Sequence, residues 1–347
     1  MSGLSSTLSS LAKRSIPITS GFNDLVRGIG EAKSKDEEDG IVAKMVDLCR
    51  GALAGGRRDP RTSKELLLYL VYIDMLGHDT RWAHAWVIQL CSDKSLIVKK
   101  AAYLAASLLL PAESELHIML TATIQADFRS DNWVVVATAL TATNRIATAE
   151  LAAVFVPAVI ALTSHASQPV ARRALLTLRR LLQLDPEAAP DVERVLVERL
   201  GHREPALMAA ALCSLRELVA RRPPQYAGLA RYLVAILKQA YEGKLGRGFE
   251  VHRAPAPFVQ VELLRLLRLL GAGNPGTAAE AAVVVAEAQR RAEGLGSALG
   301  AAVALEALRT RGAAAGRGRG RRGGRGRDAH AALGRGQRAV RGHRRAF

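Results

Sequence analysis

Aromatic residues are scarce in this sequence: Phe, Trp and Tyr make up 4% of its 347 residues, although 49% are hydrophobic. The apolar residues are therefore mostly Leu, Ala, Val and Ile. Such side chains suit close packing of helix on helix, whereas strands favour aromatic and β-branched residues. The composition thus disfavours a β-sandwich and favours an all-α protein.

Cysteine and long apolar runs are also scarce. Cys49, Cys91 and Cys213 lie far apart and no CxxC pair occurs, which excludes a zinc or disulfide framework and predicts buried thiols in a reducing compartment. The longest apolar run, residues 151–163, is shorter than the roughly 18 residues that a membrane span needs. The N-terminus lacks the apolar core of a signal peptide. We therefore expect a cytoplasmic protein with peripheral membrane contact.

Motifs of catalysis and ligand binding are missing as well. The string GAGNPG at residues 271–276 has the spacing of a dinucleotide-binding loop. However, it follows a Leu- and Arg-rich helical segment rather than a strand, and Pro275 would disturb the phosphate turn. His78 and His84 do not share a helix face, and no HExxH, GxSxG or P-loop occurs. We predict no catalytic, cofactor-binding or metal-binding residues, and hence no enzyme.

Positive charge is abundant but unevenly distributed. Of the net charge of +17, residues 312–347 carry +10, from eleven arginines and Asp328, so residues 1–311 are only mildly basic. This Gly-, Ala- and Arg-rich tail should be disordered. We favour a frameshift or gene-model artefact in a GC-rich gene, with a solvated tail and an RNA-binding tail as alternatives. Because the tail has no Tyr or Trp on which bases could stack, nucleic acid is not the expected partner.

An internal repeat occupies the middle of the chain. One register recurs five times: an apolar residue, a small or apolar residue four positions later, and a large apolar residue next. The copies are Val98-Ala102-Tyr103, Val135-Ala139-Leu140, Val170-Ala174-Leu175, Leu207-Ala211-Leu212 and Val259-Leu263-Leu264. Their spacings of 37, 35, 37 and 52 residues are typical of two-helix HEAT or armadillo repeats.

The repeat predicts an all-α, right-handed α-solenoid of helical hairpins over residues 21–311, with an extra loop at about 242–257. Residues 1–20, rich in Ser and Thr, should form a disordered leader. A short helix should follow from Phe22 to Ile29, where apolar residues have helical spacing. The acidic run 36–39 should then be a solvated link.

Five segments resemble the large subunits of adaptor-protein coat complexes. They are LVRGIGEAKSKDEE (25–38), MLGHD (75–79), KKAAYLAASLLL (99–110), residues 171–186 and residues 233–271. The last segment is the most specific, because it combines an upstream histidine with the string PFVQVELLRLLRLLG. Within the family, the chain most resembles the epsilon-adaptins of the fourth adaptor complex, followed by the gamma- and alpha-adaptins.

The resemblance covers residues 22–310, whereas the family continues through more repeats, a hinge and an appendage domain. It therefore implies a truncated N-terminal trunk that acts as a scaffold in intracellular protein transport. The implied partners are a small sigma, a medium mu and a beta-type large subunit, together with a GTPase of the ADP-ribosylation-factor type and cargo tails. The implied location is cytoplasmic, peripheral on trans-Golgi network or endosomal membranes.

The resemblance also implies two interaction surfaces. Ala85, Ile88 and Met119 match the apolar residues that face the GTPase, although Ala85 is smaller than its counterpart. Gly30 stands where related subunits use an arginine to bind acidic dileucine cargo, which argues against that role here. Three basic residues nearby could contact anionic lipid, or could simply form a solvated face. They are Arg27, Lys33 and Lys35.

Two alternative functions stay open at this point. The chain could be a generic HEAT-repeat scaffold for protein binding, or an RNA-binding protein that acts through its Arg/Gly tail. Co-purification with a sigma-type subunit would separate the adaptor hypothesis from the first alternative. Deletion of residues 312–347 should abolish a salt-sensitive RNA affinity if the second is correct.

Overall fold

The computed structural model describes residues 18–55, 59–111, 114–271 and 275–319. Within these ranges the regular structure consists of α-helices and short 3-10 helices, with one isolated β-bridge, which confirms the all-α prediction. The chain divides into two compact units, residues 1–197 and 198–347. Residues 1–17 of the expected leader and 320–347 of the expected tail lie outside the described residues.

The elements of the first unit run in chain order as follows. They are α2 (Ile18–Glu31), α3 (Lys35–Ala54), α4 (Pro60–Met75), η1 (Arg81–Ala83), α5 (His84–Cys91), α6 (Leu96–Leu109), α7 (Leu116–Phe128), α8 (Trp133–Ile146), α9 (Ala149–Leu162), α10 (Gln168–Leu184), η2 (Pro186–Ala188) and α11 (Ala189–Glu198), whose last residue falls in the second unit. The second unit continues with α12 (Pro205–Arg221), η3 (Pro223–Leu229), α13 (Ala230–Tyr241), η4 (Arg247–Phe249), α14 (Pro257–Leu270), α15 (Pro275–Glu293) and α16 (Ala298–Arg319).

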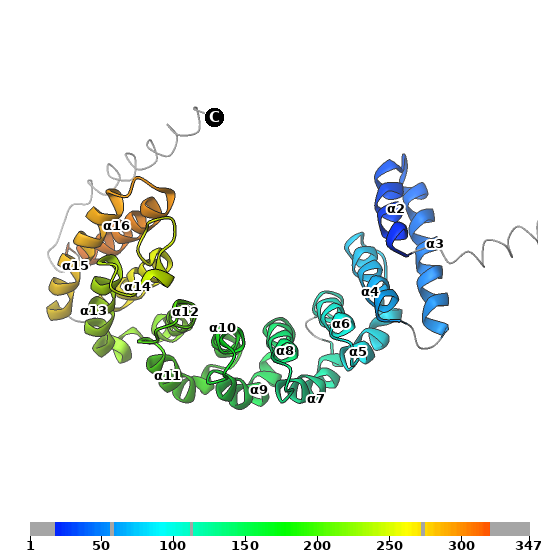
Figure 1. Cartoon of the computed structure of the whole chain (residues 1–347), viewed down its shortest axis with the longest axis horizontal. Helices are drawn as coiled ribbons and strands as arrows, with labels where there is room; N and C mark the ends of the chain where they lie inside the picture. The colour runs from blue at the N-terminus through cyan, green and yellow to red at the C-terminus, as the bar shows by residue number, and fades with distance from the viewer. Residues whose placement is uncertain (1–17, 56–58, 112–113, 272–274, 320–347) are drawn as a thin grey trace, which may run out of the picture. The chain divides into compact units, whose positions relative to one another are not determined.

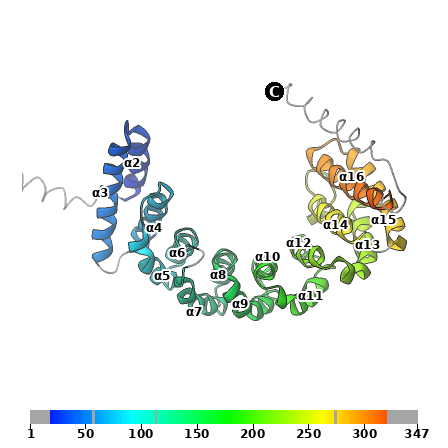
Figure 2. The same ribbon diagram turned by 180° about the vertical axis from the view of Figure 1, so that it is seen from behind.

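Each unit contains two layers of stacked helices (Figure 1). In the first unit, α5, α7 and α9 pack on one another in sequence, and so do α4, α6, α8 and α10. Helices α5 and α6, α7 and α8, and α9 and α10 form the hairpins that join the two layers. In the second unit α12, α14 and α16 form one layer, and α13 packs on α15 in the other. Figure 2, the view from behind, shows the same layers. This is the predicted α-solenoid.

The predicted repeat register lies on the second helix of each hairpin, from α6 to α14. Fourteen of its fifteen residues are buried and Val135 is half-buried, as expected for a helix face that packs against neighbouring helices. Thr177 illustrates the close approach: its hydroxyl donates to the carbonyl oxygen of Leu140, one hairpin back, at 3.2 Å. The register is therefore the seam along which hairpins stack.

Helix α16 carries a sixth copy of the register that the sequence analysis missed. Val303 and Ala307 are buried, and the Thr310 hydroxyl donates to the Leu264 carbonyl oxygen at 3.0 Å. The hydrogen bond between Thr310 of α16 and Leu264 of α14 therefore repeats the hydrogen bond between Thr177 of α10 and Leu140 of α8. The sequence pattern did not predict this copy, because α16 is rich in Ala and Gly. The interval between the copies on α14 and α16 is also longer than a typical repeat.

Three predicted boundaries differ from the structure. Helix α2 begins at Ile18, inside the expected leader, and α16 continues to Arg319, beyond the expected end of the trunk at 311. The acidic run is no link: Asp36, Glu37 and Glu38 form the first turn of α3. The Ser34 side chain caps that turn by accepting from the Glu37 amide, and carboxylates at a helix N-terminus interact favourably with the helix dipole.

The loop predicted at 242–257 is present between α13 and α14. It holds η4 and a tight turn in which His252, Arg253 and Ala256 have positive φ angles. The buried Gln260 donates from Nε2 to the carbonyl oxygen of Pro255 at 2.6 Å. This hydrogen bond explains why a glutamine lies three residues after Pro257, where it ties the turn to the first turn of α14.

The predicted short helix packs its apolar stripe on α4. Leu25 is buried, and the Phe22 ring lies 5.4 Å from that of Tyr69 and 5.6 Å from that of Tyr72. Val26, predicted as part of the same stripe, is 40% exposed. No helix in the described part of the chain is both long and apolar enough to cross a lipid bilayer.

Candidate functional site

The three predicted lipid contacts are all exposed near the junction of α2 and α3, but two of them have acidic partners. The Arg27 guanidinium lies 2.8 Å from Asp24, and the Lys35 amine lies 2.8 Å from Glu38 and 3.2 Å from Asp39. Hydrogen bonds to these two carboxylates hold the pKa of Lys35 above its usual value.

Lys33 forms no side-chain ion pair within the described residues. Exposed ion pairs contribute about 0–1 kcal/mol and open readily. Of the three predicted lipid contacts, Lys33 could therefore bind an anionic headgroup directly. Arg27 and Lys35 would first have to break their ion pairs with acidic side chains.

Two of the segments that carry the family resemblance meet at this end of the molecule. His78, in the MLGHD corner after α4, places Nε2 3.6 Å from a carboxylate oxygen of Asp39 on α3. With Glu38, these side chains have the donor atoms for a metal ion within 4.8 Å of one another. The Lys35 amine already lies against both carboxylates, so the arrangement is that of a charge network that joins α3 to the corner.

The predicted GTPase-facing residues differ in how exposed they are. Ala85 on α5 and Met119 on α7 are exposed, Met119 by 61%. Ile88 is 7% exposed and belongs to the buried core. Ile118, which sequence reasoning missed, is 60% exposed beside Met119. Apolar residues occur all round α7, so its exposed face could not be recognised from periodicity.

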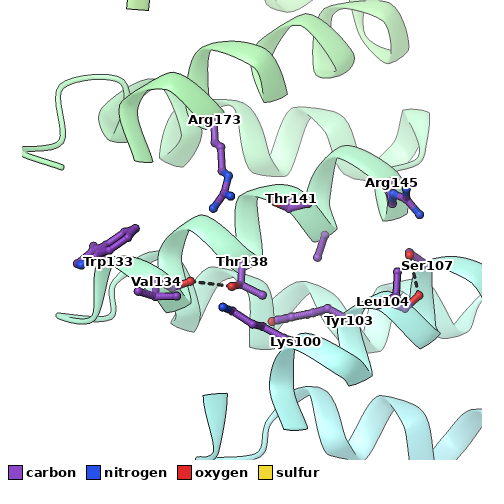
Figure 3. A pocket seen from close by; sticks show the side chains of 11 residues that line it. Lys100, Tyr103, Leu104, Ser107, Trp133, Val134, Thr138, Thr141, Arg145 and Arg173 are labelled. Atoms are coloured by element: carbon purple, nitrogen blue, oxygen red, sulfur yellow. Dashed lines mark hydrogen bonds between the residues drawn. The ribbon is translucent and has the colours of Figure 1, made fainter. Parts of the chain in front are cut away.

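A groove in the second layer of the first unit was not predicted. It has a volume of about 400 Å³ and is lined by residues from three helices (Figure 3). They are Lys100, Tyr103, Leu104 and Ser107 of α6, Trp133, Val134, Thr138, Thr141, Ala142 and Arg145 of α8, and Arg173 of α10. Helical periodicity alone gave no sign of it, because its lining comes from three different repeats.

The floor of the groove rests on a buried polar network. The Tyr103 hydroxyl donates to Asp127 Oδ2 at 2.6 Å, and the Lys99 amine donates to both oxygens of the same carboxylate, at 2.7 and 2.8 Å. Burial, followed by the hydrogen bond to Asp127, raises the pKa of Tyr103. The phenol therefore stays protonated and fixes the ring that forms the floor.

The fold agrees with comparisons to known proteins. Residues 45–311 match the family described as the adaptin N terminal region. The chain belongs to this family. It is 35% identical over 288 residues to the AP-4 complex subunit epsilon of Arabidopsis thaliana, which covers 83% of the chain and 31% of that protein. It is 31% identical over 275 residues to the AP-4 complex subunit epsilon-1 of Homo sapiens, 79% of the chain and 24% of that protein.

A solved structure is similar in fold. It is titled a homology model of the full-length AP-3 complex in an intermediate open conformation, and it matches with a TM-score of 0.54 at 21% identity, covering 72% of this chain and 44% of that one. The predicted resemblance to adaptin large subunits, and to the epsilon type, is thus confirmed. The chain spans about a third or less of the length of the relatives named above.

Some of the proposed surfaces lie inside the residues that match the family, and others lie outside them. Ala85, Ile88 and Met119 lie inside the adaptin N-terminal region, and so does the groove between α6 and α10. The lipid contacts predicted at residues 27, 33 and 35 precede it. The Arg/Gly tail follows the match and begins at its edge, so the alternative of a tail-led RNA-binding protein finds no support in the family.

Proposed function

We propose that this chain acts as the large-subunit trunk of a heterotetrameric adaptor complex that sorts cargo into transport vesicles. The family match over residues 45–311 carries this proposal, and stacked helical hairpins fit a scaffold because they present long faces to several partners at once. Its partners would be a small sigma, a medium mu and a beta-type large subunit. The family is one of structural subunits, which favours a scaffold over an enzyme.

The experiment that tests this role is co-expression with the small subunits of the different adaptor complexes. The full chain should co-purify with the sigma subunit of the fourth complex and more weakly with those of the first and second. Failure to bind any sigma subunit, by a chain that circular dichroism shows to be helical, would contradict the proposed role and leave the generic scaffold as the better explanation.

Recruitment by a GTPase of the ADP-ribosylation-factor type is the second part of the proposal. The supporting observation is the pair of exposed apolar residues, Ile118 and Met119, on α7, which packs on α5, the helix that carries the exposed Ala85. Met119→Glu should abolish binding to the GTP-loaded form in a pull-down. Val154→Glu is the matched control, since Val154 is 45% exposed on α9 of the same layer. Equal loss in both variants would contradict a specific surface.

Location on the trans-Golgi network or endosomal membranes is the third part. Lys33 supports it as the predicted lipid contact without a carboxylate partner, because each basic residue near an anionic surface contributes about 1 kcal/mol. Lys33→Glu should reduce co-sedimentation with vesicles that contain phosphatidylinositol phosphates. Unchanged co-sedimentation would show that membrane contact lies elsewhere.

A further inference from the structure

The groove between α6, α8 and α10 is open to solvent and carries charge of one sign. Lys100, Arg145 and Arg173 project into it from three different helices (Figure 3), and none of its lining residues is acidic. These three side chains are exposed and form no ion pair within the described residues. Three cations around one groove without a counter-charge favour an anionic occupant.

The same groove offers apolar contacts that a purely ionic ligand would leave unused. Trp133 is 47% exposed at the first residue of α8, and Leu104 is 42% exposed on α6. Trp133 lies at one end of the groove, and Leu104 lies toward the other end, near Ser107 (Figure 3). An exposed tryptophan is the kind of anchor that a partner's large apolar side chain covers, since aromatic residues dominate the energetics of interfaces.

The hydroxyl groups of the lining distinguish a peptide from a phosphate. Thr138 donates to the Val134 carbonyl oxygen at 2.7 Å, Thr141 to that of Ala137 at 2.8 Å, and Ser107 to that of Leu104 at 2.8 Å. Each hydroxyl donates its one proton to a carbonyl oxygen of its own helix. Only its lone pairs, which accept hydrogen bonds, therefore face the groove. Lone pairs accept from the N–H groups of a peptide backbone and repel the oxygens of a phosphate.

The dimensions suit a short extended segment. Trp133 and Arg145 begin and end the groove along α8, and a helix rises about 1.5 Å per residue, so they lie about 18 Å apart. An extended chain covers about 3.3 Å per residue, so about six residues span this distance. The floor is preformed, because Tyr103 is held by Asp127 at 2.6 Å.

We propose that this groove binds an extended acidic segment of a partner polypeptide, with a bulky apolar side chain at the Trp133 end and carboxylates on Lys100, Arg145 and Arg173. The inference goes beyond the proposed adaptor role and does not require it, since any partner that carries such a segment would fit. Its test uses the full chain alone, so that its failure and a failure to co-purify a sigma subunit are separate results.

The experiment measures fluorescence polarisation of labelled peptides of about ten residues, each with Asp and Glu around one Leu, Phe or Trp. Arg173→Glu and Arg145→Glu should each weaken binding at least about fivefold, the equivalent of one lost charge contact. Arg172→Glu is the matched control and should change the affinity less than about twofold, because Arg172 is an exposed neighbour on α10 that does not line the groove. Trp133→Ala should weaken binding of the apolar-anchored peptides and not of their alanine versions.

Several results would overturn the proposal. They are an affinity weaker than about 1 mM for every acidic peptide, equal loss in the Arg172→Glu and Arg173→Glu variants, and equal binding of peptides with Lys in place of Asp and Glu. Displacement of the peptide by single-stranded RNA at equal charge, with RNA bound more tightly, would assign the groove to nucleic acid instead. Circular dichroism and thermal unfolding confirm that each variant is folded.

Discussion

Lys99 on α6 and Asp127 on α7 form an ion pair across two successive hairpins, with Nζ 2.7 Å from Oδ1 and side chains only 9% and 11% exposed. Removal of one partner from a buried pair leaves an uncompensated charge, which costs about 3–5 kcal/mol. Asp127→Ala should therefore lower the free energy of unfolding by this amount in urea titrations, and should also leave the Tyr103 hydroxyl without its acceptor.

A double-mutant cycle separates the pair from its surroundings. Lys99→Met combined with Asp127→Ala should cost clearly less than the two single changes added together, because the second change removes the stranded charge. Asp24→Ala, which breaks the exposed pair with Arg27, is the control and should cost less than about 1 kcal/mol. Simple additivity at Lys99 and Asp127 would show that the pair is not coupled in solution.

Two buried thiols make stability sensitive to alkaline pH. Burial raises the pKa of both Cys49 and Cys91 from 9.0 to about 12. Since the folded-state pKa lies above the unfolded value, the contribution of each thiol is full below pH 9 and is lost as the pH rises from 9 toward 12. Each thiol should lower the stability by up to about 1.4 kcal/mol per pH unit within that window.

Other groups also titrate at high pH, so the measurement is a comparison of slopes. Urea unfolding at several pH values should give a shallower alkaline decline for the Cys49→Ala, Cys91→Ala double variant than for the natural chain. Neither thiol should react with Ellman's reagent at pH 8 until the chain unfolds, because the thiolate is the reactive form. Rapid reaction of either residue in the folded protein would contradict its burial.

Glu306 of α16 is anchored to α14 through Arg268, while Arg309 belongs to α16 itself. The Glu306 side chain is 4% exposed, and its carboxylate lies 2.8 Å from Arg268 and 3.2 Å from Arg309. Glu306→Ala should destabilise α16 by about 1–3 kcal/mol, less than a fully buried pair, because the arginines are a third or more exposed and water can solvate them. Hydrogen exchange should quicken in α15 and α16, with α6 and α8 unchanged. Glu280→Ala, an exposed change on α15, should leave both regions as they were.

Gln260 controls the loop before α14. Gln260→Leu removes the 2.6 Å hydrogen bond to Pro255 while it keeps the buried volume roughly constant. The turn with positive φ at His252 and Arg253 should then open more often, since the cost of this strained backbone is no longer offset. Limited digestion with trypsin should cut after Arg253 several times faster than in the natural chain. An unchanged rate there, with faster cleavage elsewhere, would indicate general destabilisation instead.

The stacking seam could be predicted because its chemistry is local. One copy of the register consists of Val170, Ala174 and Leu175, which have the spacing of one helix face. The copies follow one another at the spacing of a two-helix repeat, so both periods can be read directly from the sequence. The acidic run that begins at Asp36 was predicted as a solvated link, but it starts a helix because the Ser34 side chain accepts from the Glu37 amide and caps the first turn. The register on α16 was not predicted, because α16 is rich in alanine; the hydrogen bond from Thr310 to Leu264 shows that the helix stacks as the earlier repeats do.

The predicted surfaces were only partly recoverable for a different reason. Residues three apart on one helix are only about 60° apart around its axis, yet Ala85 is exposed while Ile88 is buried, because the edge of a packed neighbour falls between them. Which face of α5 or α7 meets another helix depends on neighbours that lie far away in the chain. Exposure at these positions is therefore a property of the stack and not of the segment.

The sequence by itself determined the fold class, the repeat and the family, because these depend on residue types at regular intervals. Tertiary structure alone decided the groove that brings Lys100, Arg145 and Arg173 together, and the ion pair of Lys99 with Asp127 beneath it. No periodic signal connects these residues. Their proximity follows from the side-by-side packing of successive hairpins, which sets the distance and the rotation between helices that are distant in sequence.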